Sequence, residues 1–301
     1  MLHLLDSAAM KRSDFHYSLP PELIAERPPA QRRDSRLLCL DGCTGAVSDR
    51  RFAELPDLLR AGDLLVVNDT RVLNARLYAR KPTGGRVECL VEQVMDSRRA
   101  QVRLRGARGV LPGLRLRFEG GAEATVQERQ GESFVLQLDA ARDFLTLMER
   151  HGHVPLPPYI RRTDEPLDRE RYQTVFAARP GAIAAPTAGL HLDQAMLNEL
   201  LRRGVERVAI TLHVGAGTFS PMRVEEVSAH RLHFESVEVS EAACQAIRDT
   251  RARNGRVIAV GTTVVRALEA AALAARDDPD PAAIAPFSGQ TDLFIHPGFE
   301  F

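Results

Sequence analysis

Three segments of the chain share one pattern, a short apolar run that follows a glycine and ends in a polar loop. The runs are 64–67, 208–212 and 257–260, and the loops that follow them are 68–71, 213–218 and 261–263. Near-continuous apolar runs of this length, rich in β-branched residues, are typical of strands that are covered on both faces. The pattern therefore predicts three buried strands.

Amphipathic segments beside these runs predict helices. Asp193 can cap a helix with one apolar face that stops at Gly204, and Ser240 can cap a second helix that ends at Asn254. After the third run, an apolar stripe from Val264 to Ala272 indicates another helix, capped by the threonines before it. Alternation of helices and buried strands predicts an α/β fold with a mainly parallel sheet. Ligands bind beyond the carboxyl ends of such strands, so the three polar loops are expected to line one crevice.

The middle of the chain has a different pattern. From about Leu73 to Leu138, short runs alternate apolar and polar residues and are separated by glycine-containing turns. This period of two predicts antiparallel strands, which we expect to form a small β-barrel. The α/β pattern resumes after a proline-rich stretch at 154–162. We therefore expect a discontinuous main domain, 10–72 and 150–301, with an inserted barrel domain at 73–149.

Composition places the chain among globular proteins, with 44% hydrophobic and 27% charged residues. No apolar run approaches the roughly 20 residues that a membrane helix needs. The opening residues lack the features of a signal peptide, and Met10 is as good a start as Met1. The four cysteines form no C-x-x-C pair, which favours reduced thiols. We expect a cytoplasmic protein without a membrane partner.

The formal net charge is zero, but basic residues are concentrated in one stretch. Between Ser97 and Phe118 the chain carries seven arginines and no acidic residue. Two compatible interpretations stay open. The arginines can form the solvated face of alternating strands, or they can face a polyanion such as RNA.

Candidate catalytic residues lie at the ends of the predicted elements. His191 precedes a helix cap and His213 ends a strand, so either can serve in acid–base chemistry or remain structural. Asp69 is a candidate base or ribose ligand; the alternative is an Asx-turn in which it pairs with Arg71. These features indicate an α/β enzyme that binds a small molecule, but they do not identify its reaction.

Glycines in two of the polar loops suggest places where a ligand approaches the backbone. Gly215 and Gly217 permit close contact or a positive φ, although Ser220 breaks the dinucleotide motif G-x-G-x-x-G. The loop Gly261-Thr262-Thr263 opens a helix, whose free amides can hold a carboxylate, a phosphate or a ribose hydroxyl.

The stretch HRLHFE raises a metal-site hypothesis. His230 and His233 could share a helix face, with Glu235 as a third ligand. The zincin spacing H-E-x-x-H is absent, however, and no further ligand cluster is evident in the sequence. We expect no metal.

Eleven stretches together resemble one family, the S-adenosylmethionine:tRNA ribosyltransferase-isomerases of queuosine biosynthesis. They include SDFHYSLPPELIAERP, GDLLVVNDTRVLNARL, VPLPPYIRR, PGAIAAPTAGLHL, TLHVGAGTFSPMRVE, HRLHFE and GRVIAVGTTVVRALEAA, in the family's order along almost the whole chain. The resemblance implies an α/β main domain with an inserted β-barrel. It also implies that the ribosyl moiety of S-adenosylmethionine is transferred and isomerised onto 7-aminomethyl-7-deazaguanine at the tRNA wobble position. The products would be epoxyqueuosine-tRNA, adenine and methionine.

The resemblance also implies roles for individual residues. His191 and His213 become the acid–base candidates, with Asp69 and Glu269 in reserve. The candidates for binding S-adenosylmethionine are Thr187, Gly189, Gly215, Gly217, Thr218, Gly261, Thr262, Thr263, Arg71 and Arg266, the two arginines facing the methionine carboxylate. The Arg-rich barrel segment becomes a candidate contact for tRNA.

The expected partner is a tRNA with a GUN anticodon, bound by a monomer. Family members usually continue past the final PGFEF stretch with a further loop and helix. A tRNA-binding protein without catalysis is the alternative from another class, and adenine release distinguishes the two.

Overall fold

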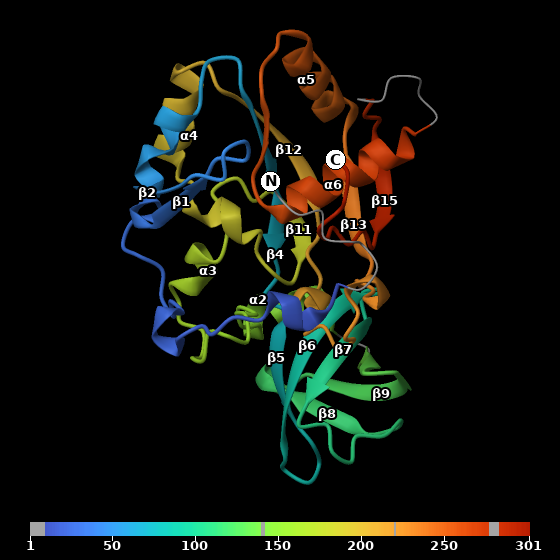
Figure 1. The fold of residues 1–301 in the computed structure, drawn as a ribbon. Helices are drawn as coiled ribbons and strands as arrows, with labels where there is room; N and C mark the ends of the chain where they lie inside the picture. The colour runs from blue at the N-terminus through green and yellow to red at the C-terminus, as the bar shows by residue number, and fades with distance from the viewer. Residues whose placement is uncertain (1–9, 140–141, 220, 277–282) are drawn as a thin grey trace.

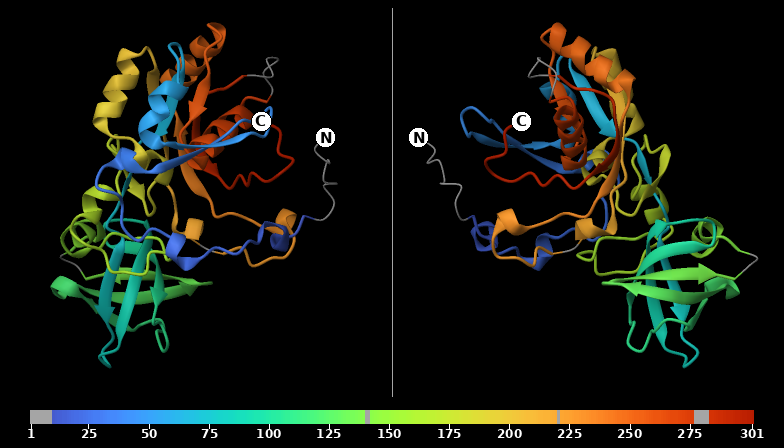
Figure 2. Two further views of the ribbon diagram at one scale, coloured as in Figure 1. Left: turned by 60° about the vertical axis from the view of Figure 1, so that its left-hand side comes forward. Right: turned by 90° about the vertical axis from the view of Figure 1, so that its right-hand side faces the viewer.

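The computed structural model describes residues 10–139, 142–219, 221–276 and 283–301. They form an α/β part and a β-barrel, joined near the middle of the molecule (Figure 1). Both views in Figure 2 place the barrel at one end of the molecule and the α/β part at the other. The α/β class and the inserted small barrel predicted from the sequence are confirmed.

The barrel is closed, and all its strands pair antiparallel in the order β10-β7-β6-β5-β8-β9. Its strands are β5 (Arg76–Arg80), β6 (Arg86–Val94), β7 (Arg99–Arg105), β8 (Arg115–Phe118), β9 (Glu123–Gln130) and β10 (Ser133–Leu138). Alternate residues point inward, as the period of two predicts, so that Val87, Cys89 and Val91 of β6 are buried. Helix α2 (Phe144–His151) packs Phe144, Leu147 and Met148 into the same core. The barrel strands lie within the expected insertion, whose borders at 73 and 149 stay a prediction.

The main sheet has the strand order β14-β3-β12-β13-β15. These strands are β14 (Val257–Ala259), β3 (Leu64–Asn68), β12 (Glu206–Leu212), β13 (Glu235–Val239) and β15 (Phe287–Thr291). The three strands expected from the sequence, β3, β12 and β14, lie side by side and parallel. The sequence did not indicate β13 and β15, which extend the sheet antiparallel and make it mixed.

Helices cover both faces of this sheet. Helix α4 (Gln194–Arg202) packs with Leu65 and Val67 on one face, whereas α5 (Glu241–Ala252) and α6 (Thr262–Ala274) pack with Leu64 and Val66 on the other. Two expected caps are present, because the Asp193 carboxylate accepts from the Met196 N–H and the Ser240 hydroxyl from the Ala243 N–H. The expected threonine cap of α6 is wrong, since Gly261 occupies the cap position and both threonines lie within the helix. The sheet is thus buried on both sides, which explains its unbroken apolar strands.

The remaining elements are short. They are strands β1 (Arg36–Leu40), β2 (Val47–Arg51), β4 (Thr70–Val72) and β11 (Arg179–Ala182), helices α1 (Leu55–Leu58) and α3 (Asp168–Arg171), and 3₁₀-helices η1 (Arg12–Phe15), η2 (Pro21–Leu23), η3 (Arg32–Asp34), η4 (Phe52–Glu54), η5 (Glu119–Gly121), η6 (Thr187–His191), η7 (Ala216–Phe219) and η8 (Val227–Ala229). Strand β4 continues from β3 and pairs parallel with β11, which brings the segment around Gly181 to the end of the main sheet.

In the part of the chain that the structure describes, no helix has the length and hydropathy needed to cross a membrane. All four cysteines are free, and Cys89 and Cys244 are buried.

Candidate functional site

Two clefts lie beside the loops that follow β12 and β14, and the first also borders the barrel. The loop 68–71 after β3 lines neither of them, so the expected single crevice with all three loops is not formed. The first, here called the barrel cleft, has a volume of about 410 Å³ and is lined by Leu73, Val91, Glu92, Gln93, Val94, Leu145, Pro180, Gly181, Ile183, His213, Gly215, Phe234, Glu235, Ser236 and Gln290. The second, the helix cleft, measures about 380 Å³ and is lined by Tyr159, Tyr172, Ala184, Ala185, Pro186, Thr187, Ala188, Val214, Thr218, Phe219, Gly261, Thr262 and Thr263.

The two clefts share a wall. Along 213–215, His213 and Gly215 line the barrel cleft and Val214 lines the helix cleft. Ile183 lines the barrel cleft and Ala184 lines the helix cleft. The Ile183 N–H donates to the Val214 carbonyl at 2.8 Å, which joins the two segments. The clefts therefore lie back to back across these two backbone segments.

His213 is held firmly in the barrel cleft. Its Nδ1 is 2.7 Å from the Thr70 hydroxyl, and its ring packs against Gly181, where a Cβ would come within 2.6 Å of the ring. Burial lowers the pKa of His213, although the negative charge of Asp69 opposes this effect. His213 is therefore neutral at neutral pH. Among the described residues only Thr70 hydrogen-bonds the ring, so Nε2 can face a substrate.

Asp69 lines neither cleft. Its carboxylate accepts from the Thr211 hydroxyl at 2.6 Å, and Arg179 approaches it to 4.0 Å. The Asx-type contact belongs to Asn68, whose Oδ1 accepts from the Thr70 N–H at 3.1 Å. The suggested pairing of Asp69 with Arg71 is wrong, since Arg71 is exposed on β4 and its charge meets no carboxylate among the described residues.

A buried ion pair supports the floor of the barrel cleft. Glu235, at the start of β13, pairs with Arg266 of α6, and its Oε1 accepts from the Gly215 N–H at 2.8 Å. The Arg266 Nε donates to the Leu293 carbonyl, while its buried Nη2 has no hydrogen-bond partner among the described residues. Arg266, expected to bind the carboxylate of a ligand, thus forms an ion pair with a carboxylate of the protein. From the sequence, Glu235 was a candidate only for metal binding, and its pairing with Arg266 was not predicted.

The helix cleft is built around the N-terminus of α6. Gly261 caps this helix with φ +89, and no side chain caps its first-turn amides. The Thr263 hydroxyl is buried and has no hydrogen-bond partner in the described part of the chain. Thr187, Thr218, Tyr159 and Tyr172 also line this cleft. Free amides, hydroxyls and aromatic rings in one cleft suit a ligand with a carboxylate, a ribose and a base.

The other glycines expected to bind the cofactor contact protein instead. A Cβ at Gly217 would clash with the His233 ring, and one at Gly189 would lie 2.9 Å from Phe176 and Thr174. These two positions need glycine for close packing, and neither lines a cleft.

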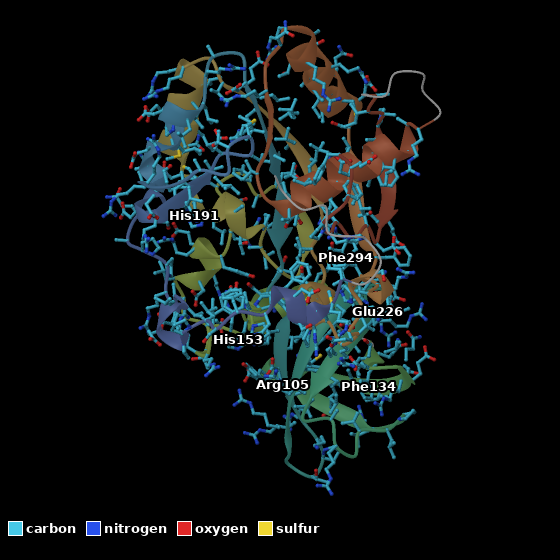
Figure 3. The ribbon with its side chains drawn as sticks, viewed as in Figure 1. Arg105, Phe134, His153, His191, Glu226 and Phe294 are labelled. Carbon is cyan, nitrogen blue, oxygen red and sulfur yellow. The ribbon has the colours of Figure 1, made fainter. Side chains whose placement is uncertain are left out.

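The structure does not bring His191 and Glu269 to His213. The His191 ring stacks on Phe52 at a centroid distance of 5.2 Å, and burial lowers its pKa. Figure 3 shows it on the side of the α/β part that carries β1 and β2. Glu269 lines a separate cleft with Arg251 and Phe301, where burial raises its pKa. Neither residue lines the barrel cleft or the helix cleft.

The hypothesis that His230, His233 and Glu235 form a metal site on one helix face is wrong. Residues 230–234 are not helical, and Glu235 begins a strand. His230 packs against the ring of Phe294 at 5.1 Å, and the His233 ring lies against Gly217. The described parts of the chain contain no group of three histidine, cysteine or acidic side chains arranged to hold a metal.

An α/β domain with a helix N-terminus in one cleft and a partly buried histidine in the adjoining one has the arrangement of an enzyme that binds a small molecule. The chain belongs to the queuosine biosynthesis protein family, whose family model matches residues 12–301. It is 50% identical over 297 residues to the S-adenosylmethionine:tRNA ribosyltransferase-isomerase of Nitrosospira multiformis, covering 97% of this chain and 83% of the relative. It is 51% identical over 292 residues to the enzyme of the same name from Acidithiobacillus ferrooxidans, with the same coverage of 97% and 83%.

A solved structure is also similar to this chain, that of the S-adenosylmethionine tRNA ribosyltransferase from Thermotoga maritima. The two are 29% identical, with coverage of 96% of this chain and 80% of the other, at a TM-score of 0.46.

Proposed function

We propose that this chain transfers and isomerises the ribosyl moiety of S-adenosylmethionine onto 7-aminomethyl-7-deazaguanine at the wobble position of tRNA, with release of adenine and methionine. The relatives named for this activity support the reaction, at 50% and 51% identity. The observation that supports its location is the shared wall of the two clefts, with His213 at its end. One cleft then holds the ribosyl donor and the other the acceptor base.

In this proposal the helix cleft binds S-adenosylmethionine. The first-turn amides of α6 and the Thr263 hydroxyl hold its carboxylate, because a helix N-terminus favours negative charge. Thr187 and Thr218 reach the ribose hydroxyls, and the tyrosine rings pack against the adenine. Neither Arg71 nor Arg266 lines the helix cleft, so this proposal gives them no contact with S-adenosylmethionine.

The barrel cleft binds the wobble base, and His213 exchanges protons there. A base must remove the acidic proton beside the sulfonium, and an acid must protonate the departing adenine. Neutral His213 suits the first step, because its lowered pKa keeps the ring unprotonated and Thr70 fixes its orientation. Asp69 stabilises the imidazolium that forms, through its charge. His191 and Glu269 remain outside this scheme.

Three finer statements belong to the same proposal. The acceptor is a tRNA with a GUN anticodon, the active species is a monomer, and the reaction takes place in the cytoplasm. A tRNA substrate supports the cytoplasmic location. Gel filtration of the purified chain tests whether it is a monomer.

Adenine release tests the reaction directly. The purified chain is incubated with S-adenosylmethionine and with tRNA that carries 7-aminomethyl-7-deazaguanine, and free adenine is quantified by chromatography. Release that requires the modified base is the expected result. tRNA binding without adenine release would favour a binding protein over an enzyme.

Replacing Thr263 by Val tests the helix cleft. The hydroxyl has no protein partner, so its loss is expected to leave stability unchanged while raising the KM for S-adenosylmethionine about 3–10-fold. Thr250→Val is the matched control, because the Thr250 hydroxyl donates to the Ala246 carbonyl within α5. This control is expected to lower stability by about 1 kcal/mol without changing KM. An unchanged KM for S-adenosylmethionine in Thr263→Val would show that the carboxylate does not bind at the Thr263 hydroxyl.

A further inference from the structure

A row of three arginines crosses the outside of the barrel. Strand register places Arg86 of β6 directly opposite Arg80 of β5, and Arg80 directly opposite Arg117 of β8. All three side chains are exposed on the outer face. We call this set the arginine row. Like charges that face each other directly across a sheet destabilise it, so the row calls for an explanation beyond the fold.

The neighbouring carboxylates do not neutralise the arginine row. Glu88 pairs with Arg76 at 3.1 Å. Glu123 lies opposite Arg117 in the register of β8 and β9, but its carboxylate pairs with Arg115 at 2.9 Å. Within the described residues, no carboxylate forms an ion pair with a member of the row. The positive charge of the row is therefore available to an external anion.

The surroundings of the row extend this basic surface. The Arg86 guanidinium lies 4.2 Å from the centroid of the Tyr78 ring. Lys81 donates to backbone carbonyls of Gly106 and Arg108, so its charge also lies at this end of the barrel. Arg105 projects from β7 with 80% of its side chain exposed, and Figure 3 shows it on the barrel. Arginine, lysine and tyrosine side chains in one patch are typical of surfaces that bind nucleic acid.

One strand connects the row to the barrel cleft. Strand β6 carries Arg86 at its first residue and Gln93, which lines the cleft, seven residues later. At roughly 3.3 Å per residue this separation is about 23 Å. A duplex strand rises about 3.4 Å per nucleotide, so the distance corresponds to roughly seven nucleotides. A nucleic acid with one base in the cleft can thus reach the row with its backbone.

We propose that the arginine row binds backbone phosphates of the tRNA and holds the anticodon arm along β6 while the wobble base occupies the barrel cleft. This inference rests on the proposed function, since it takes the acceptor to be tRNA. The row positions the substrate through charge alone, because it lies on the side of the barrel, away from the reacting groups.

A pair of single variants tests the row. Arg117→Gln removes one arginine of the row, and Arg202→Gln removes an exposed arginine of α4 in the main domain, so both change the net charge equally. tRNA affinity is measured by fluorescence anisotropy across a salt series. Arg117→Gln is expected to weaken binding several-fold at 50 mM salt and to reduce the slope of log K against log salt by about 1. Arg202→Gln is expected to change neither quantity.

The triple variant Arg80→Gln, Arg86→Gln, Arg117→Gln enlarges the effect. We expect its tRNA affinity at 50 mM salt to fall at least tenfold and the slope to fall by about 2–3. The KM for tRNA should rise while kcat at saturating tRNA stays near wild type, since no reacting group changes. Its unfolding temperature should be equal to that of the wild type or higher, because facing like charges are removed.

Each alternative outcome can be recognised. Unchanged affinity and slope in the triple variant, with a wild type that releases adenine, would overturn the row as an RNA site and leave the proposed function intact. Equal weakening by Arg117→Gln and Arg202→Gln would also overturn it. Binding of the wild type to anionic vesicles that the triple variant loses, with tRNA affinity unchanged, would assign the row to a lipid surface instead. A wild type without adenine release contradicts the proposed function and not the row.

Discussion

Replacing His213 by Gln is expected to lower kcat for adenine release about 10²–10⁴-fold, which is the usual contribution of general acid–base catalysis. His213 lines the barrel cleft at the wall it shares with the helix cleft. Gln retains a polar group for the Thr70 hydroxyl, which now lies 2.7 Å from Nδ1, so the fold should be preserved. The measurement is single-turnover adenine release at saturating concentrations of both substrates.

His191→Gln is the matched control for this substitution. Both histidines are partly buried and both have a lowered pKa, but His191 contacts Phe52 and lines neither cleft. We expect His191→Gln to reduce kcat by less than about tenfold, through packing alone. If the two variants lost activity equally, or if His191→Gln lost more, the assignment of His213 as the base would be wrong.

The pH dependence should report the same group. Burial holds the pKa of His213 below the ordinary value of about 6.5, so the neutral ring persists to lower pH than in a free histidine. The rate is therefore expected to be level through neutral pH and to fall only below about 6.5. Asp69→Asn removes a charge that raises this pKa, so the acid limb should move to still lower pH.

The strands and caps of the main domain were predictable because their signals are local. The runs that became β3, β12 and β14 are apolar without interruption, as strands covered by helices on both faces must be. Strand β15 gave no such signal, since Phe287 is followed by Ser, Gly and Gln on an edge strand with little burial. A polar edge strand is selected by its neighbour in the sheet and not by its own composition.

The candidate site was predicted in part for the same reason. The Gly261–Thr263 loop was recognised because a glycine between a strand and a helix is a local feature, and it lines the helix cleft. The role of Glu235 depends on Arg266, which lies 31 residues away along the chain. One signal was available, because in the alternating run 235–239 the glutamate occupies an inward position. A charge on the buried face of a strand needs a partner.

The distinction between His191 and His213 was not accessible from the sequence. His191 precedes a helix cap and His213 ends a strand, and neither position by itself indicates a catalytic role. Only the pairing of β4 with β11 brings Gly181 and Thr70 around His213, and only the packing of η6 against Phe52 turns His191 elsewhere. The Thr70–His213 and Phe52–His191 contacts each join residues more than a hundred positions apart, so no local pattern records them.

Removing the Glu235 carboxylate is expected to destabilise the main domain strongly. Only 6% of the Glu235 side chain and 14% of the Arg266 side chain are exposed. Glu235→Ala leaves a buried guanidinium without its counter-charge and the Gly215 N–H without its acceptor, which should lower the free energy of unfolding by about 3–5 kcal/mol. Urea denaturation followed by circular dichroism measures this loss.

Glu238→Ala provides the matched control on the same strand. Glu238 also pairs with an arginine, Arg179, but both side chains are about half exposed, at 46% and 50%. A pair so accessible to solvent contributes at most about 1 kcal/mol, so this variant should be nearly as stable as the wild type. Equal losses in the two glutamate variants would show that the buried pair has no special role.

A double replacement separates stability from function even if Glu235→Ala does not fold. Glu235→Leu with Arg266→Met substitutes apolar side chains for both partners, which commonly restores stability because no buried charge is left unpaired. The Gly215 amide still loses the Glu235 oxygen that now lies 2.8 Å away. Since Gly215 and His213 line the same cleft, we expect the double variant to fold and to bind S-adenosylmethionine, yet to release adenine much more slowly. Full activity in a stable double variant would limit the pair to a structural role.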